Sequence, residues 1–349
     1  MRHLPVNAGS DHFRALLVPC TCLSSASVRT LTFAVLRRLA DGEFHSAQAL
    51  AQGLQVSRGS IWSALNEARA AGFAVQRLHG RGYRLSDRLD WLDAPRINAD
   101  LAQHGLTVHV VDCCKSTNAD MLSEAEAGAP SGRVLVAEMQ TEGRGRLGRP
   151  WHSGIANALT FSVLWRFDRS VAGLAGLSLA VGVAIARALR MQGIGAELKW
   201  PNDLLWQGRK LGGILIEIRG DSLGPCAAVI GVGLNVHLGA MERQRIDQLA
   251  ADLTEAGTSE RSRSQWLVHI LRELSAVLRQ FGEQGFAAVR EEWMRYHAHQ
   301  GAGVCLAMPD GTRLEGDALG VDESARLLIA TAQGIQRVHA GDVSLRART

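Results

Sequence analysis

The stretch Gly143-Arg144-Gly145-Arg146-Leu147-Gly148-Arg149 interleaves glycines and arginines within seven residues. Glycine permits positive-φ turns and a close approach of the backbone to a ligand, and arginine offers a planar fork of donors that matches carboxylate and phosphate oxygens. The pattern predicts a loop that wraps an anion. The loop alone leaves a second reading open, a flexible nucleic-acid-binding tract.

The composition is that of a globular protein. The chain has 349 residues, of which 46% are hydrophobic and 21% charged, which is enough for two or three domains. Apolar stretches are interrupted before the roughly 20 residues that span a bilayer, so we expect no membrane span. The cysteine spacing described below, which favours reduced thiols, leads us to expect a cytoplasmic location. Residues 1 to 27 are expected to form a disordered extension.

The spacing of the cysteines and the scarcity of lysines are both informative. Six cysteines show neither disulfide-framework nor zinc-ligand spacing, so we expect reduced thiols, with Cys113 and Cys114 packed in a strand. Only three of the 38 basic residues are lysines, at 115, 199 and 210. In a chain this rich in arginine, a remaining lysine indicates a need for its compact ammonium group.

The N-terminal part predicts a winged helix-turn-helix over residues 28 to 88. Helical spacing covers residues 30 to 40, 46 to 52 and 58 to 71, with Ser46 as the N-cap of the second helix, and residues 73 to 85 alternate as a hairpin. Residues 28 to 90 carry nine arginines against five acidic residues, which favours a polyanion as partner.

The candidate DNA-binding residues lie on the third helix and the wing. A winged helix used only for protein contacts is the alternative, and Trp62 has no obvious base-reading role. The candidates are Ser57, Arg58, Ser60, Asn66, Arg77, Arg81 and Arg84.

The rest of the chain predicts an α+β fold. Residues 86 to 98 are expected to be a linker in which Pro95 breaks the periodicity. Strands are expected at 106 to 112, 134 to 139, 159 to 164, 213 to 218 and 227 to 231, and helices at 174 to 189 and 266 to 281. Short strands and turns near 309 to 311 and 341 to 342 predict a small C-terminal barrel.

Further motifs accompany the glycine and arginine loop. They are Ser116-Thr117-Asn118, Gln140, Lys199-Trp200-Pro201-Asn202-Asp203, Arg209-Lys210-Leu211-Gly212-Gly213 and Gly231-Val232-Gly233-Leu234-Asn235. Together with the winged helix they resemble the bifunctional biotin ligase and biotin operon repressor family, from about residue 30 to the end.

The resemblance implies a fold and a reaction. It implies a winged helix-turn-helix at 28–88, a central mixed-sheet catalytic domain similar to biotin and lipoate ligases at 100–298, and an SH3-like β-barrel at 299–349. The implied enzyme joins biotin to ATP, with Mg²⁺, to form biotinyl-5′-adenylate. It then passes the biotinyl group to a lysine of a biotin carboxyl carrier protein.

The resemblance also implies roles for the motif residues. Catalytic roles fall to Lys210 and Arg146, biotin binding to Ser116, Thr117, Asn118, Gln140, Arg144, Gly145, Arg146 and Lys210, ATP or adenylate binding to Arg144, Arg146, Arg149, Lys210 and Asn235, and support to Lys199, Asn202, Asp203 and Gly213.

The chemistry of the residues agrees with these roles. Hydroxyl and amide groups suit the neutral ureido ring of biotin, and cations remove the repulsion between a carboxylate and ATP. Lys210 fits the bridging position between them, and no enzyme nucleophile is needed.

Three assignments leave alternatives open. Asn118 is expected to cap the following helix or hold the loop rather than to contact biotin alone. Asp203 is expected either to orient Lys210 or the loop or, with Asn202 as the other candidate, to support Mg²⁺, although no protein metal-ligand set is expected. For Asn235, structural support and adenylate contact are equally expected.

One segment departs from the family pattern. Where the family closes an aromatic side chain over adenine, this chain has Leu249, Ala250 and Ala251. We therefore expect weaker retention of the adenylate.

Two rival functions remain open at this stage. One is a lipoate or octanoate ligase, and the other is a biotin-sensing transcription factor without ligase activity. If the repressor reading holds, operator DNA and a homodimer formed with bound adenylate are the expected partners.

Overall fold

The computed structural model describes residues 30–86, 89–220, 224–257, 261–308, 311–339 and 344–347. The chain divides into two compact units, Met1–Arg88 and Leu89–Thr349. The extension predicted for residues 1–27 lies outside the described residues, as do parts of the turns expected near 310 and 342.

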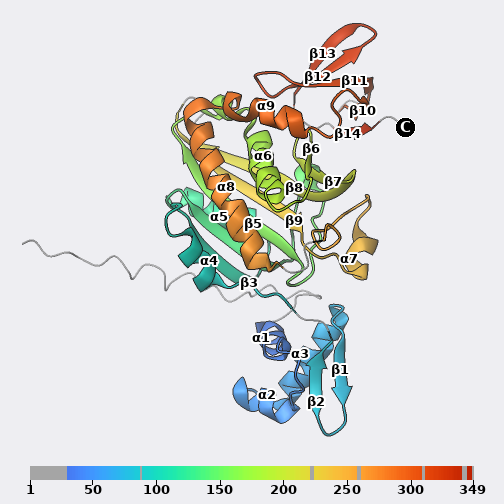
Figure 1. Ribbon diagram of the computed structural model, residues 1–349. Helices are drawn as coiled ribbons and strands as arrows, with labels where there is room; N and C mark the ends of the chain where they lie inside the picture. Colours follow the sequence, from blue (N-terminus) through green and yellow to red (C-terminus); the bar gives the residue numbers. More distant parts are fainter. Residues whose placement is uncertain are drawn as a thin grey trace, which may run out of the picture. The chain divides into compact units, whose positions relative to one another are not determined.

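The first unit is a winged helix-turn-helix (Figure 1). The side chains of Ser46 and Ser57 accept backbone hydrogen bonds three residues ahead, each of 3.0 Å, and so cap the second and third helices. The buried faces of the helices include Phe33, Leu36 and Leu65. The elements are α1 (Thr30–Leu39), α2 (Ala47–Gly53), α3 (Arg58–Ala70), β1 (Val75–Leu78) and β2 (Gly82–Leu85).

Gly82 joins the wing to the segment before α2. His45 N donates to Tyr83 O, and Tyr83 N donates to His45 O, each at 2.9 Å. Gly82 has φ +112°, and a Cβ there would lie 2.1 Å from the carbonyl oxygen of His45. Only glycine fits this junction.

The second unit is built on a seven-stranded mixed sheet. Its first two strands are parallel and all other neighbours are antiparallel. Cys113 and Cys114 end the first strand, as predicted. In spatial order the strands are β3 (Thr107–Cys114), β4 (Arg133–Gln140), β5 (Ala158–Phe167), β9 (Cys226–Asn235), β8 (Arg209–Gly220), β7 (Asp203–Trp206) and β6 (Glu197–Lys199).

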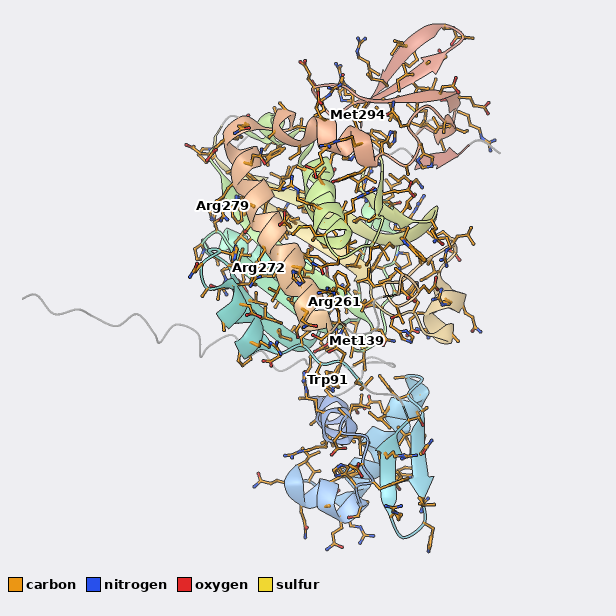
Figure 2. All side chains as sticks on the ribbon, in the orientation of Figure 1. Trp91, Met139, Arg261, Arg272, Arg279 and Met294 are labelled. Atoms are coloured by element: carbon orange, nitrogen blue, oxygen red, sulfur yellow. The ribbon has the colours of Figure 1, made fainter. Side chains whose placement is uncertain are left out.

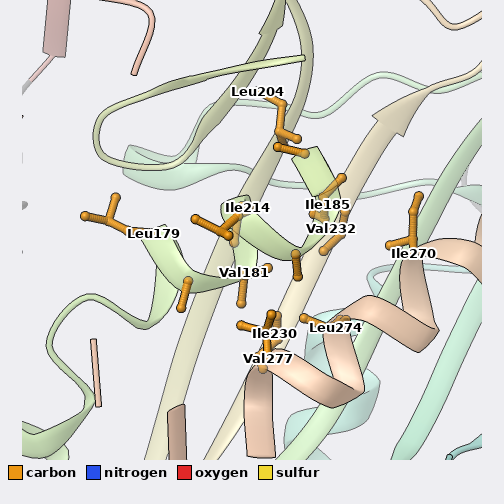
Figure 3. Close-up of a cluster of buried hydrophobic side chains, with 14 of the residues drawn as sticks. Leu179, Val181, Ile185, Leu204, Ile214, Ile230, Val232, Ile270, Leu274 and Val277 are labelled. Carbon is orange, nitrogen blue, oxygen red and sulfur yellow. The ribbon is translucent and has the colours of Figure 1, made fainter. Parts of the chain in front are cut away.

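Helices cover both faces of this sheet (Figure 1). The helices α4 (Ala94–Leu101), α6 (Leu177–Arg190) and α8 (Arg263–Gln284) share a large core with one face. The helix α5 (Thr117–Glu126) packs on the other face with a smaller apolar cluster. In Figure 3, Val181 of α6 and Leu274 and Val277 of α8 lie over Ile230 and Val232 of β9.

The predicted linker at 86–98 is wrong in its second half. Helix α4 begins at Ala94, with the Asp93 side chain accepting from Arg96 N at 3.1 Å. Pro95 lies in the first turn, where its missing N–H leaves no hydrogen bond unmade, so it starts a helix instead of breaking one. Arg272 and Arg279, shown along α8 in Figure 2, donate to the carbonyls of Asp100 and His104 at 2.9 and 3.2 Å.

A buried ion pair fixes the start of the second unit. The guanidinium of Arg263 pairs with the carboxylate of Glu138, and both side chains are almost completely buried. Arg263 also donates to Asp90 O and Ala158 O, and Glu138 accepts from Leu92 N at 2.9 Å. The pair therefore joins α8 and both strands that flank residues 141–157 to the segment where the unit begins.

Where a small barrel was predicted at the C-terminus, the described residues form a five-stranded antiparallel sheet. Helix α9 (Ala287–Tyr296) precedes it, and Trp200 Nε1 donates to Ala325 O of this sheet's β11–β12 connection at 3.2 Å. The strands, in spatial order, are β13 (Gly334–Val338), β12 (Leu327–Thr331), β11 (Arg313–Val321), β10 (Gly303–Ala307) and β14 (Ser344–Ala347).

One segment of the described chain is long and apolar enough to cross a membrane. It covers Val171–Arg190, with a mean hydropathy of 1.8. Helix α6 lies within it and buries most of its residues in the core of the second unit, which is the behaviour of a core helix.

His297, between α9 and β10, makes folding dependent on pH. Its ring stacks on Trp293 at 4.5 Å, and burial lowers the pKa of His297 from 6.5 to about 4. An unfolded histidine takes up a proton near pH 6.5, so stability is full above that pH and falls as the pH drops towards 4.

We expect a loss of about 2 kcal/mol of unfolding free energy from His297 between pH 7 and pH 5. His297→Phe keeps a ring on Trp293 and removes this loss, which urea unfolding at the two pH values measures. Burial and the nearby Lys199 also lower the pKa of His299, so only the difference between variant and parent counts. An identical pH dependence in both would contradict the assignment.

Candidate functional site

A cavity of about 790 Å³ opens in the second unit beside the N-terminus of α5. Its wall combines the start of α5, the ends of several strands, the glycine and arginine loop, and residues 245–250. The predicted residues that line it are Ser116, Thr117, Asn118, Gln140, Arg144, Gly145, Arg146, Arg149, Lys199, Asn202, Asp203, Lys210, Gly213 and Asn235. The structure thus brings together every catalytic, substrate-binding and supporting residue that the sequence analysis named.

Hydroxyl and amide groups form one polar end of the cavity. The backbone N–H and the hydroxyl of Thr117 donate to Gln140 Oε1 at 2.7 and 3.1 Å. The hydroxyl of Ser162, fully buried on β5, donates to Thr117 Oγ1 at 2.7 Å. These bonds fix the orientation of three polar side chains before any ligand arrives.

Asn118 does not cap α5, contrary to one expectation. Thr117 is the first residue of the helix, so Asn118 already lies inside it. Its amide oxygen accepts from Ser162 at 2.6 Å, and its Nδ2 donates to Leu215 O at 3.2 Å and to Glu217 Oε2 at 2.8 Å. Asn118 therefore ties α5 to β5 and β8 beneath the cavity.

Glycines of β9 make the space above these groups. A Cβ on Gly231 would lie 2.2 Å from Asn118 Oδ1, and one on Gly233 would lie 2.4 Å from the ring of Trp151. The alternate residues Ile230, Val232 and Leu234 enter the core on the opposite face. The period of two in a strand thus separates cavity from core.

The glycine and arginine loop is a tight strap. Gly145 N donates to Arg149 O at 2.7 Å, and Trp151 N donates to Gly143 O at 2.8 Å. Arg146 Nη1 donates to Asn202 Oδ1 at 3.3 Å, so the loop is held against the segment that follows β6. The sequence predicted a wrapping loop, and the structure places that loop over the cavity.

A β-bulge aims Lys210 into the cavity. Leu205 pairs with Lys210 and Leu204 with Gly212, so Leu211 is an extra residue in β8. The bulge places Lys210 on the same face as Asp203, and Lys210 Nζ lies 2.8 Å from Asp203 Oδ1. Lys199 Nζ lies 4.0 Å from the other carboxylate oxygen, so Asp203 holds both lysines.

Asn235 supports the neighbouring segment while lining the cavity. Its Nδ2 donates to Ala251 O at 3.0 Å and to Lys210 O at 3.4 Å. The backbone of Lys210 also bonds Leu249 O and Ala251 N. The side chain of Leu249 is 77% exposed at this rim.

The sequence analysis missed several groups at the site. Trp151 and His299 line the cavity, while Ser162 and Glu217 support residues that do. The two alternating glycines of β9 were a signal for a bulky ring opposite them, but only the fold reveals that the ring is Trp151. Nothing local marks Ser162 or Glu217.

The side chains that line the cavity could bind Mg²⁺ only together with the phosphates of a nucleotide. Among the described residues no three histidine, cysteine or carboxylate side chains form a metal-binding cluster. Asp203 is already paired with Lys210. An Mg²⁺ ion arriving with ATP would take most of its oxygen ligands from phosphates and water, as is common for this ion.

A second surface lies on the first unit. Arg58 on α3 and Arg77 and Arg81 on the wing are exposed, and Trp62 beside them is 59% exposed. Ser57 is occupied as a helix cap, and Arg84 donates to Gln76 Oε1.

Ser60 and Asn66 are also engaged locally. The hydroxyl of Ser60 lies 2.9 Å from that of Ser57, and Asn66 accepts from Arg69 at 3.3 Å. Of the candidate DNA-binding residues, the exposed arginines are therefore the best placed to reach phosphates.

Comparison with known proteins assigns the family. Residues 110–235 match the biotin/lipoate A/B protein ligase family, residues 31–84 an HTH domain, and residues 301–346 the biotin protein ligase C terminal domain. The bifunctional ligase/repressor BirA of Escherichia coli is 34% identical over 319 residues, which are 91% of this chain and 98% of that protein. The chain belongs to the biotin ligase/repressor family.

Two further relatives agree with this family. The biotin–[acetyl-CoA-carboxylase] ligase of Mycobacterium tuberculosis is 35% identical over 65% of this chain and 85% of its own length. A biotin protein ligase from Aquifex aeolicus, solved in complex with biotin and ATP, superimposes with a TM-score of 0.60 at 29% identity, covering 69% of this chain and 99% of that one. The fold class predicted from the sequence is confirmed.

Gly231→Ala tests how tightly the cavity is built. Asn118 is held by several hydrogen bonds and cannot withdraw from the new methyl group, so we expect ligand binding to be lost and stability to fall by about 1–3 kcal/mol. Isothermal titration and thermal unfolding measure the two effects. Gly195→Ala, with nothing within 4 Å of the added Cβ, is the matched control. Normal ligand binding by Gly231→Ala would refute this packing.

Proposed function

We propose that this protein is an ATP-dependent biotin–protein ligase that forms biotinyl-5′-AMP and transfers biotin to a lysine of a biotin carboxyl carrier protein, and that it also acts as a biotin-responsive repressor. The observation that carries the ligase is a cavity in which a neutral polar end meets a cationic wall that contains Lys210. The family relationship supports both halves of the proposal.

The neutral end suits the biotin ring system. A ureido group needs both donors and acceptors, which Ser116, Thr117 and Gln140 supply, and it carries no charge that would demand an ion. Apolar side chains that also line the cavity, among them Trp151, Phe161 and Ile214, suit the rest of the molecule. The carboxylate of biotin would then point towards the loop arginines and Lys210.

The cationic wall suits the reaction between two anions. Six cationic side chains line the cavity against two carboxylates, namely Arg144, Arg146, Arg149, Lys199, Lys210 and Arg245 against Asp203 and Asp247. This excess lowers the repulsion between the carboxylate and the triphosphate, and it stabilises the charge that develops in the transition state.

The reaction then needs two displacements. A biotin carboxylate oxygen attacks the α-phosphorus of ATP, and pyrophosphate leaves. The amine of the acceptor lysine next attacks the biotinyl carbonyl, and AMP leaves. Lys210, held by Asp203, stabilises the negative charge at the bridging oxygen in both steps. No covalent enzyme intermediate is required.

The repressor half requires operator DNA and a homodimer. The HTH domain supplies exposed arginines on α3 and the wing, and we infer that adenylate binding favours pairing of two chains on two half-sites. Sedimentation with and without biotin plus ATP tests the dimer. A monomer under all conditions would remove this part of the proposal and leave the ligase intact.

Two assays separate the rival functions. If biotin, and not lipoate, supports pyrophosphate release, the lipoate or octanoate ligase is excluded. If biotin and ATP label an acceptor domain, a sensor without ligase activity is excluded. If biotin supports neither pyrophosphate release nor labelling of the acceptor domain, the proposal is overturned.

Lys210→Gln tests the catalytic assignment. Removing one preorganised positive donor from the transition state should lower pyrophosphate release about 10²–10³-fold. Biotin binding should change much less, because the ring contacts remain. Lys115→Gln, which removes an exposed lysine outside the cavity lining, is the control. Full activity of Lys210→Gln would rule out the assigned role.

Arg77→Gln tests the DNA surface. Loss of one phosphate contact should weaken binding to all sequences and reduce the slope of log K against log salt by about 1. Arg38→Gln on α1 changes the net charge equally and serves as control. Equal slopes for the two variants would show that only net charge matters and that the wing makes no specific phosphate contact.

A further inference from the structure

Glu217 lies behind the cavity and belongs to none of the family motifs quoted above. It is on β8, on the face that α5 covers, and its side chain is 23% exposed. It is absent from the cavity lining. Its carboxylate nevertheless contacts two residues that line the cavity, one from each end.

The first contact fixes Asn118, beneath the polar end of the cavity. Asn118 Nδ2 donates to Glu217 Oε2 at 2.8 Å, while the amide oxygen of Asn118 accepts from Ser162. Ser162 in turn donates to Thr117. A continuous series of hydrogen bonds therefore runs from the polar end of the cavity to Glu217.

The second contact holds the loop. Arg144 Nη2 donates to both carboxylate oxygens of Glu217, at 3.0 and 3.3 Å. Both hydrogen bonds use the same nitrogen, and Arg144 also lines the cavity. The Arg144 side chain is 45% exposed and would lose much rotamer freedom if an incoming anion had to order it.

We propose that Glu217 is a positioning residue that holds Arg144 ready for the ligand carboxylate. Because Glu217 also binds Asn118, it links the orientation of Arg144 to the polar end of the cavity. This inference rests on the proposed function, because it assumes a ligand with a neutral ring at Thr117 and a carboxylate at the loop. Glu217 itself does not touch the ligand. It acts by ordering the guanidinium in advance, which reduces the entropy lost on binding.

The charge of the ligand provides a readout that a merely structural role would not affect. Biotin and biotinamide share the ring system and differ in the carboxylate. Glu217→Gln keeps an amide oxygen that can accept from Asn118, but it removes the negative charge that orients Arg144.

We expect Glu217→Gln to raise the dissociation constant for biotin about tenfold, the upper end of the cost of ordering one flexible side chain on binding, and to leave that for biotinamide within about twofold. KM for biotin should rise while kcat changes little. Titration calorimetry of the full-length chain, with pyrophosphate release, measures these values.

Two control variants accompany this measurement. Glu126→Gln removes an exposed carboxylate at the end of α5 that pairs with Arg219 of β8. Neither residue lines the cavity, so the variant should change the binding of neither ligand. In an Arg144→Gln background, Glu217→Gln should have no further effect on biotin, because the group that it orients is gone.

The outcomes distinguish this inference from the function on which it rests. Equal weakening of biotin and biotinamide, or tighter binding of biotin, would overturn the role of Glu217. If the unaltered protein binds neither ligand, the proposed function itself fails. A thermal midpoint unchanged by Glu217→Gln, together with selective loss of biotin, supports the proposal.

Discussion

The alternation along β9 is the constraint on which both the fold and the site depend. Ile230, Val232 and Leu234 enter the core under α6 and α8, and each buried side chain of this size contributes about 1.5–3 kcal/mol. The residues between them, Gly231 and Gly233, form the cavity on the other face. A slip of one residue would exchange the two sets, so the register that builds the core also builds the site.

Charge is arranged by the same backbone. A regular β8 would turn Lys210 away from Asp203, and the extra residue Leu211 turns it back. The carboxylate then holds Lys210 at 2.8 Å and lies 4.0 Å from Lys199. One acidic side chain thus offsets part of the repulsion between two lysines, while the lining as a whole stays cationic. The bulge, and not the strand pattern, sets the position of the reactive ammonium group.

The sequence predicted those parts whose signals are local. Caps and periodicity located α2, α3 and α8, and motif residues such as Gln140 and Lys210 were named before their positions were known. The prediction at Pro95 was wrong because proline is common both in linkers and in the first turn of a helix, and here it lies in the first turn of α4.

The parts that failed depend on partners distant in sequence. Ser162 matters because Thr117 and Asn118 meet it across 45 and 44 residues, and Glu217 meets Asn118 across 99. No spacing within one segment encodes such contacts. The expectation that Asn118 caps α5 was wrong for the same reason, since its partners lie on two strands rather than in its own helix.

The loop over the cavity is anchored at its base by buried groups and carries partly exposed groups on the loop itself. Its base is fixed by Arg263, which pairs with Glu138 and bonds Ala158 O with almost no exposure to water. Removing one partner of such a pair leaves a buried charge, so this end has no low-energy alternative. The loop itself carries the guanidinium of Arg144, which Glu217 orients and which is still 45% exposed. The glycine and arginine loop is therefore anchored through its flanking strands by buried groups, while the guanidinium that Glu217 orients stays accessible to an incoming anion.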